Sequence, residues 1–254
     1  MKKSKLPLVL RNRRIAALLL TASMALTQGA SALTIPDSIK VIEDEAFYNT
    51  NAYDNLVIPE TVEWIGDRAF AGNPNLKDIV VRGTNVSLGL DALGTVSEPK
   101  TIHGSKYALL QMYAEAHSYD YQIDVDKLLA TARSMLGESY SRHDCVTYVW
   151  LCYKSIGIKT EATCRNVQEY TKGTKITSIS ALQPGDIMCW KNDDVDYCTH
   201  VALYVGAGKV DGRSYSSGVF IEASRGARKV RYNYIAPEGS SYYTRNFMFA
   251  WRIL

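Results

Sequence analysis

One cysteine of this chain stands where its side chain could act as a nucleophile. The stretch "RHDCVTYVWLCYKSIGI" (residues 142–158) has apolar residues at the spacing of one helical face, which begin just after Cys145 and end at Gly157, where a helix usually stops. A cysteine attacks acyl carbons well only as the thiolate, and both the N-terminal end of a helix and a nearby imidazolium lower the pKa of a thiol. We therefore predict a helix that presents a reactive Cys145 at its start. The face expected to be buried carries Val146, Val149, Trp150 and Tyr153.

Among the four histidines, His200 is favoured as the partner of this thiol. His103 and His117 belong to a different part of the chain, and His143 is expected to point away from Cys145 at the helix start. His200 opens the alternating stretch "HVALYVGAG", which predicts a strand. If that strand packs across the start of the helix, the imidazole and the thiol meet and form a dyad.

A histidine base also needs a polar group that fixes its tautomer and stabilises its charged form. Glu222, in the predicted strand "VFIEAS", is favoured because a hairpin would bring it beside His200. Asp211 is the rival, since it lies nearer in sequence, although in a turn-rich connection. Cys189, Cys198 and His200 could instead bind zinc, but the chain has no Cys-x-x-Cys pair and no obvious fourth ligand, which disfavours a metal site.

The cysteines all lie in the C-terminal half of the chain. An odd number in an exported protein leaves at least one thiol unpaired. Cys152 lies two turns deeper on the same helix face as Cys145 and is expected in the core, while Cys189 and Cys198 could bridge a hairpin. The full set is Cys145, Cys152, Cys164, Cys189 and Cys198.

The N-terminal half contains an internal repeat. The stretch "IPDSIKVIEDEAF" (35–47) returns as "IPETVEWIGDRAF" (58–70), a period of 23, and a degenerate third copy follows. A period in the low twenties predicts a leucine-rich solenoid, in which only the stacking of repeats buries a core. The segment 101–123 is expected to close the array with a capping helix and a strand. One face of that helix would carry Leu109, Met112 and Tyr113.

The first 32 residues have the features of a secretory signal peptide. Six Lys and Arg residues among the first fourteen precede a short apolar stretch that ends in Ala30-Ser31-Ala32, and we expect cleavage after Ala32. A membrane anchor is the alternative, but the apolar core of about twelve residues is short for a span, which needs about twenty. Without the six cations the net charge falls from +3 to −3, which leaves no basic footprint for nucleic acid. We expect no membrane span after cleavage.

From about Val125 the pattern changes to helices followed by strands. The stretch "DVDKLLATARSMLG" predicts an amphipathic helix ahead of the Cys145 helix, and "LQPGDIMCW", "HVALYVGAG", "GVFIEAS", "KVRYNYI" and "FMFAWRIL" predict strands. Helices first and strands afterwards predict an α+β domain with an antiparallel sheet. The expected domains are a signal peptide (1–32), a repeat module with its cap (33–124) and this α+β domain (125–254).

Two families resemble parts of this chain. The repeated Ile-Pro…Ile…Ala-Phe spacing resembles the BspA-type leucine-rich repeats of bacterial surface proteins. The stretches "DCVTYVWLCYKSIGI", "LQPGDIMCW", "THVALYVGAGKV" and "FIEAS", in that order, resemble the NlpC family of papain-like cell-wall peptidases over about residues 125–254. The second resemblance implies a papain-like fold, with N-terminal helices packed on an antiparallel sheet. It also implies that Cys145 is the nucleophile, His200 the base and Glu222 the third polar residue.

The resemblance further implies a secreted or cell-surface bacterial enzyme. Its expected activity is hydrolysis of the γ-D-glutamyl–diamino-acid bond in peptidoglycan stem peptides, without a metal or an organic cofactor. Tyr140 matches a tyrosine of the family and is expected to line the site. Asp144 matches the aspartate of an Asp-Cys-Ser triplet, so it could bind the amine of the substrate or merely cap the helix.

Three departures from the family keep other functions open. Val146 replaces the serine of the triplet, the segment before Asp144 is shortened to "SRH", and the link between His200 and Glu222 is longer. One alternative is a CHAP-type N-acetylmuramoyl-L-alanine amidase, which would cut between sugar and peptide with the same dyad. Another is a catalytically inactive surface-binding protein. The repeats could bind a surface or host ligand, or only act as a spacer.

Overall fold

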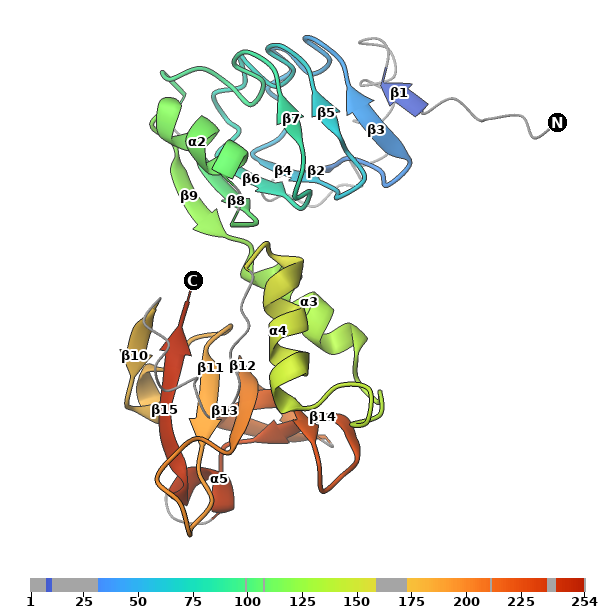
Figure 1. The fold of residues 1–254 in the computed structure, drawn as a ribbon. Helices are drawn as coiled ribbons and strands as arrows, with labels where there is room; N and C mark the ends of the chain where they lie inside the picture. Colours follow the sequence, from blue (N-terminus) through green and yellow to red (C-terminus); the bar gives the residue numbers. More distant parts are fainter. Residues whose placement is uncertain are drawn as a thin grey trace, which may run out of the picture. The chain divides into compact units, whose positions relative to one another are not determined.

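The structure, a computed structural model, describes residues 8–10, 32–98, 100–106, 108–158, 173–210, 212–236 and 241–253. It divides into two compact units, residues 1–124 and 125–254, and each is described by itself (Figure 1). Most of the predicted signal peptide lies outside the described residues. Within the parts that are described, no helix has the length and apolar character needed to cross a membrane.

The strands of the first unit form two parallel sheets, and each repeat contributes one strand to each sheet (Figure 1). In one sheet Val41 lies opposite Trp64, which lies opposite Ser87, so each step is 23 residues. The predicted 23-residue solenoid is therefore confirmed. The strands are β1 (Leu8–Leu10), β3 (Ile39–Ile42), β5 (Trp64–Ile65) and β7 (Ser87–Leu88) in the first sheet, and β2 (Ala32–Thr34), β4 (Asn55–Ile58), β6 (Asp78–Val81), β8 (Thr101–Gly104) and β9 (Asp120–Ile123) in the second.

The repeats are joined by stacked apolar side chains and by close turns. The rings of Phe47 and Phe70, one repeat apart, are parallel with centroids 5.0 Å apart, and both side chains are fully buried. Burial of each such side chain stabilises the fold by about 1.5–3 kcal/mol. At Gly66 a Cβ atom would lie only 2.4 Å from the backbone nitrogen of Asp44 in the preceding turn, so the turns stack at a distance that only glycine permits.

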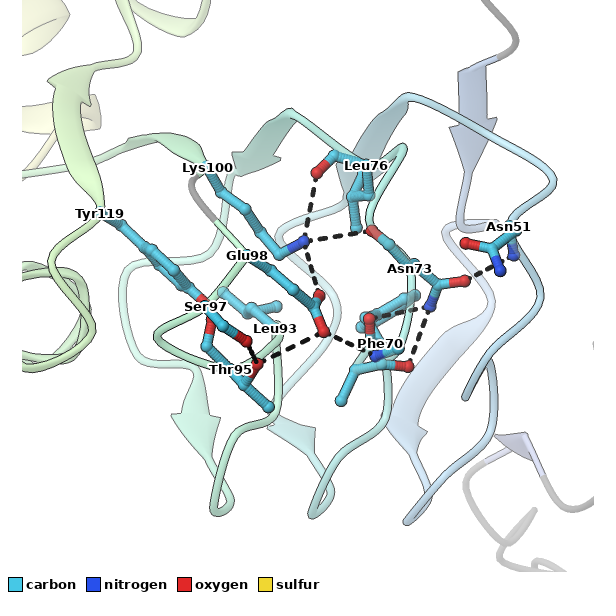
Figure 2. Close-up of polar contacts among 12 residues, drawn as sticks. Asn51, Phe70, Asn73, Leu76, Leu93, Thr95, Ser97, Glu98, Lys100 and Tyr119 are labelled. Atoms are coloured by element: carbon cyan, nitrogen blue, oxygen red, sulfur yellow. Dashed lines mark hydrogen bonds and ion pairs between the residues drawn. The ribbon is translucent and has the colours of Figure 1, made fainter.

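Buried polar groups hold successive repeats together, as Figure 2 shows. The Asn73 amide donates to the carbonyls of Phe47 and Phe70 (both 2.8 Å). The Lys100 ammonium, which is fully buried, lies 3.1 Å from the Glu98 carboxylate and donates to the Leu76 carbonyl at 3.1 Å. Burial lowers the pKa of Lys100, and the neighbouring Glu98 partly offsets this effect. The polar cluster is paired internally, which marks it as structural.

The cap of the solenoid has the predicted helix and strand. The helix α2 (Ala108–Ala116) precedes β9. Of the apolar residues at helical spacing, Tyr113 packs against the core, whereas Leu109 and Met112 are 63% and 61% exposed. The residues of α2 that are buried in the core are Leu110 and Ala114.

Replacing Lys100 with alanine is expected to lower the free energy of unfolding of the repeat module by about 3–5 kcal/mol, because the Glu98 carboxylate would stay buried without its partner. Urea unfolding of the full chain, followed by far-UV circular dichroism, measures this change. The control is Lys40→Ala, which removes the exposed ion pair with Glu63 and should cost less than about 1 kcal/mol. Equal losses in the two variants would contradict the role of Lys100.

In its described residues, the second unit combines two longer helices and one short helix with a six-stranded sheet (Figure 1). The helices α3 (Val125–Ser134) and α4 (Cys145–Ser155) pack against each other, and α4 also packs on β12 and β13. The strand order is β10-β15-β11-β12-β13-β14 with antiparallel neighbours. The remaining elements are β10 (Thr174–Ile176), η2 (Ile179–Ala181), β11 (Ile187–Trp190), β12 (His200–Val210), β13 (Arg213–Ser224), β14 (Lys229–Tyr234), α5 (Tyr242–Arg245) and β15 (Phe247–Arg252).

The buried stripe of α4 matches the predicted one in part. Val149, Tyr153 and Cys152 are completely buried, as expected. Val146 and Trp150 are only partly buried, and Tyr148 is completely buried instead. The helix is covered on two sides, since the Tyr148 hydroxyl donates to the Ala132 carbonyl of α3 (3.4 Å) while the sheet covers the other side. The contact with α3 therefore explains why Tyr148 is part of the buried face of the helix.

The strand β12 was expected to bury one face, but its first half buries both. Val201 and Leu203 are buried on one face, and Ala202 and Tyr204 are buried on the other. Ala202 and Tyr204 belong to a second apolar cluster on the side of the sheet that α4 does not cover. His200, the first residue of β12, therefore stands at the end of a strand that is fixed from both sides.

Candidate active site

Cys145 is the first residue of α4, as the sequence predicted. The preceding residue, Asp144, has an extended backbone, and its carboxylate accepts a hydrogen bond from the backbone N–H of Thr147 at 2.7 Å. Asp144 is thus the N-cap, which stabilises the helix start by roughly 1 kcal/mol. The Cys145 side chain is 7% exposed and lies at the positive end of the helix dipole. That position stabilises a thiolate.

The imidazole of His200 contacts both Cys145 and Glu222. Its Nε2 atom lies 2.7 Å from Oε2 of Glu222, and a second side-chain hydrogen bond joins the ring to the Cys145 thiol. Because Glu222 occupies Nε2, Nδ1 is the ring nitrogen left for the sulfur. The three residues named from the sequence therefore lie together, with His200 in the middle.

Glu222 is a buried carboxylate with four side-chain partners. It is 1% exposed. Besides His200, its oxygens accept hydrogen bonds from Arg231 (3.0 Å), Asn233 (2.9 Å) and Tyr243 (3.1 Å). The register explains two of these contacts, since Glu222 pairs with Arg231 across β13 and β14, and Asn233 lies two residues further along β14 on the same face. A buried charge persists only when it is paired and hydrogen-bonded in this way.

These contacts shift the pKa values of His200 and Glu222 in opposite directions. Burial lowers the pKa of His200, but the hydrogen bonds with Cys145 and Glu222 and the negative charges of both outweigh burial and raise it to about 9. Burial raises the pKa of Glu222, but the hydrogen bond and charge of His200, with Asn233 and Arg231, lower it to about 2. Both shifts favour an imidazolium beside a carboxylate at neutral pH.

The aromatic groups behind His200 fix the plane of its ring. Trp190, directly across β11 and β12 from His200, stacks on the imidazole with centroids 5.7 Å apart. The Trp190 indole N–H in turn donates to the Tyr243 carbonyl at 2.7 Å. Sequence reasoning missed Trp190, Arg231, Asn233 and Tyr243. The strand register could have indicated Arg231 and Asn233, but no sequence signal pointed to Tyr243.

Each of the other described residues that the sequence offered as a site candidate has contacts of its own. Tyr140 is half-buried in the loop before α4, where its backbone N–H donates to the Arg228 carbonyl (3.0 Å). His143 bonds Glu138 at 2.8 Å. His103 and His117 pair with Asp78 and Asp91 in the repeat module. Asp211, the rival of Glu222, lies outside the described residues.

The other cysteines are either buried in the core or lie outside the described residues. Cys152 is fully buried, and burial raises the pKa of its thiol to about 12, as expected for a core residue. Cys189 is a buried free thiol, so the proposed Cys189–Cys198 bridge is absent. Cys164 lies outside the described residues. Among those that are described, no three His, Cys, Asp or Glu side chains are grouped to hold a metal ion.

Comparisons with known proteins assign a family resemblance to each unit. Residues 25–113 match the BspA type leucine rich repeat region, and residues 134–252 match the NlpC/P60 family. The resemblances inferred from the sequence motifs are thereby confirmed. No curated protein matches the chain.

Several solved structures are similar to the second unit. The NlpC/p60 domain of the peptidoglycan hydrolase SagA is 22% identical with a TM-score of 0.37, over 51% of this chain and 99% of that one. An NlpC/P60 family protein from Bacillus cereus is 25% identical with a TM-score of 0.40, over 51% of this chain and 40% of that one. The peptidoglycan hydrolase RipB from Mycobacterium tuberculosis is 20% identical with a TM-score of 0.37, over 51% of this chain and 64% of that one. This chain thus spans less than two thirds of the latter two.

The stability of the second unit is expected to decrease as pH rises from about 6.5 toward 9. Folded His200 keeps its proton until about pH 9, whereas the unfolded chain releases it near 6.5, so this stabilisation is complete below 6.5 and is lost as pH rises through 9. NMR titration of the His200 ring should give a midpoint near 9, and Glu222→Gln should lower that midpoint. A parent midpoint near 6.5 that the substitution leaves unchanged would contradict the described contacts.

Proposed function

We propose that this chain is an exported cysteine peptidase that hydrolyses amide bonds in the stem peptides of peptidoglycan. The observation that carries the proposal is the hydrogen bond between Cys145 and His200, with the Glu222 carboxylate buried behind the ring. A thiol, an imidazole and an orienting carboxylate are the groups that acyl transfer needs. The match of residues 134–252 to the NlpC/P60 family supplies the substrate class.

In the proposed mechanism the Cys145 thiolate attacks the carbonyl carbon of the scissile amide. The resulting oxyanion is stabilised by the backbone N–H of Cys145 at the start of α4 and by one further donor. The His200 imidazolium gives its Nδ1 proton to the departing amine nitrogen as the C–N bond breaks, which leaves a thioester. His200 then takes a proton from water, whose oxygen attacks the thioester, and a carboxylic acid and the thiolate are released.

Glu222 acts through His200 in this proposal. Its carboxylate holds Nε2–H, so that Nδ1 faces the sulfur, and it stabilises the imidazolium before the amine leaves. Arg231, Asn233 and Tyr243 occupy its remaining lone pairs and keep it ionised. These three are positioning residues for the carboxylate.

We propose the γ-D-glutamyl–diamino-acid bond as the one cleaved. Asp144 is exposed beside Cys145, so one carboxylate oxygen can cap α4 while the other binds the free amine of a stem peptide. Tyr140, half-buried in the same loop, is proposed to line the substrate site. The replacement of the family serine by Val146, which is partly buried, removes one hydroxyl from this region.

The two units are proposed to have different tasks. Residues 125–254 would carry the hydrolysis, and the repeat module (33–124) would bind a surface or host ligand or act as a spacer. Removal of residues 1–32 as a signal peptide would also remove β1 and leave β3 at the edge of its sheet. The mature enzyme would then act outside the cytoplasm, on the cell wall.

Replacing Cys145 with alanine is expected to reduce peptidoglycan hydrolysis by at least about a thousandfold, because no nucleophile is left. Zymography and mass spectrometry of soluble fragments measure this loss. The matched control is Cys152→Ala, which removes a buried thiol from the same helix and should retain activity within about twofold if the fold persists. Hydrolysis by Cys145→Ala at the parent rate would show that the proposal is wrong.

The same fragments separate the proposal from its alternatives. Cleavage within the peptide supports an endopeptidase, whereas stem peptides released whole from the sugar indicate the CHAP-type amidase. A parent protein that yields no fragment, and whose Cys145 resists alkylation, would indicate the inactive binding protein. The replacement of the family serine by Val146 is the observation that favours testing whether the protein is inactive.

Asp144→Ser separates capping from substrate binding, because serine can cap a helix but carries no charge. If Asp144 binds the substrate amine, KM for a stem peptide with a free amino terminus should rise about tenfold, equivalent to about 1.4 kcal/mol, with kcat little changed. N-acetylated peptide is the control and should be insensitive to the change. If parent and variant hydrolyse the peptide with a free amino terminus with the same KM and kcat, then Asp144 acts only as the helix cap.

A further inference from the structure

A pocket lies in the C-terminal unit, apart from the residues of the candidate active site. Its volume is about 630 Å3, which lies in the range of small-molecule sites. Cys145, His200 and Glu222 do not line it. The loop before η2, the strands β12 and β13, the end of β14, and the α5–β15 region contribute its walls. Its serine and threonine hydroxyl groups belong to Thr177, Ser178, Ser180, Ser216, Ser217 and Thr244.

One wall of the pocket is a tyrosine whose position depends on a glycine. The Tyr204 ring lines the pocket, and a Cβ atom at Gly218 would lie 2.3 Å from its Cε2 atom. Gly218 also has φ +113°, a conformation that other residues rarely adopt. Both the lack of room for a Cβ atom and the positive φ angle thus require glycine at position 218, and this glycine leaves space for the Tyr204 ring. Within the described parts of the chain, no group is hydrogen-bonded to the Tyr204 hydroxyl, which is therefore available to a ligand.

The lining excludes an ionic ligand and favours a neutral one with many hydroxyl groups. None of the described residues that line the pocket carries a charge, so a carboxylate, phosphate or ammonium group would lose hydration without a compensating partner among them. Serine, threonine and tyrosine hydroxyls both donate and accept hydrogen bonds. They can therefore pair with sugar hydroxyls, which also do both. Ile179, Ile235 and Phe247 add apolar surface for the C–H face of a sugar ring or for an acetyl methyl group.

The pocket is placed so that one polymeric substrate can reach both sites. Tyr204 follows His200 by four residues on the same face of β12, which corresponds to about 13 Å along the strand. Thr244 lines the pocket, and its neighbour on α5, Tyr243, donates to Glu222. His200 and the Tyr204 wall of the pocket thus lie on one face of β12, and one short helix contributes to both the pocket and the contacts of Glu222.

We propose that this pocket binds an uncharged N-acetylated amino sugar of the cell-wall glycan. The assignment to the wall rests on the proposed function, because the peptides cleaved there are attached to such sugars. The binding itself follows from the pocket and does not require catalysis. A bound sugar would hold the polymer while an attached peptide enters the site at Cys145.

The test is calorimetric titration of the full chain carrying Cys145→Ala with chitotetraose, a soluble oligomer of N-acetylglucosamine. Saturable binding is expected, and Tyr204→Phe combined with Ser217→Ala should weaken it at least about fivefold, since two hydrogen bonds are lost. Tyr215→Phe is the matched control, because it removes a hydroxyl from the same strand outside the lining and should leave the affinity unchanged.

Four results would overturn the proposal, three of them from calorimetry. These three are the absence of saturable binding, equal affinity in the double variant, and equal affinity for maltotetraose, which has hydroxyls but no acetyl group. NMR amide shifts confined to the Cys145 region would do the same. Hydrolysis of sugar-free stem peptides by the parent tests the proposed function separately, so failure of either proposal is visible without the other.

Discussion

The buried carboxylate of Glu222 is the interaction on which the candidate site depends. A charge that is almost completely removed from water must be compensated, and here an imidazole, a guanidinium, an amide and a phenol compensate it. These four partners come from β12, β14 and α5, so the carboxylate joins three elements at one point. It also determines which nitrogen of His200 faces Cys145. Loss of the carboxylate would leave both the ring orientation and the Arg231 charge without support.

The rest of the C-terminal unit brings the sulfur to that ring. The Asp144 cap determines where α4 begins, and packing against α3 and the sheet determines where its first turn lies. The strand β12, buried on both faces, holds His200 at its first residue. The helix start stabilises negative charge on the sulfur while Glu222 stabilises positive charge on the ring. The arrangement therefore favours a thiolate–imidazolium pair.

Much of this arrangement was predictable because it follows local rules. The 23-residue period, the start of α4 at Cys145 and the strands around His200 and Glu222 each follow from spacing or alternation within short stretches. The buried stripe of α4 was predicted in part: Val149 and Tyr153 are buried as expected, whereas Val146 and Trp150 satisfy the apolar spacing but tertiary contacts select Tyr148 instead. Tyr243 could not be predicted either, since its contact with Glu222 depends on how a four-residue helix folds back onto the sheet.

The most direct test of the account is the rate at which iodoacetamide alkylates Cys145 as a function of pH, read by peptide mapping. A thiolate stabilised by His200 should react at pH 6 nearly as fast as at pH 8, and His200→Ala should slow the reaction at pH 6 at least about tenfold. If the parent rate instead rises steadily through pH 8.5 like that of an ordinary thiol, and His200→Ala leaves it unchanged, then Cys145 and His200 do not form the proposed pair.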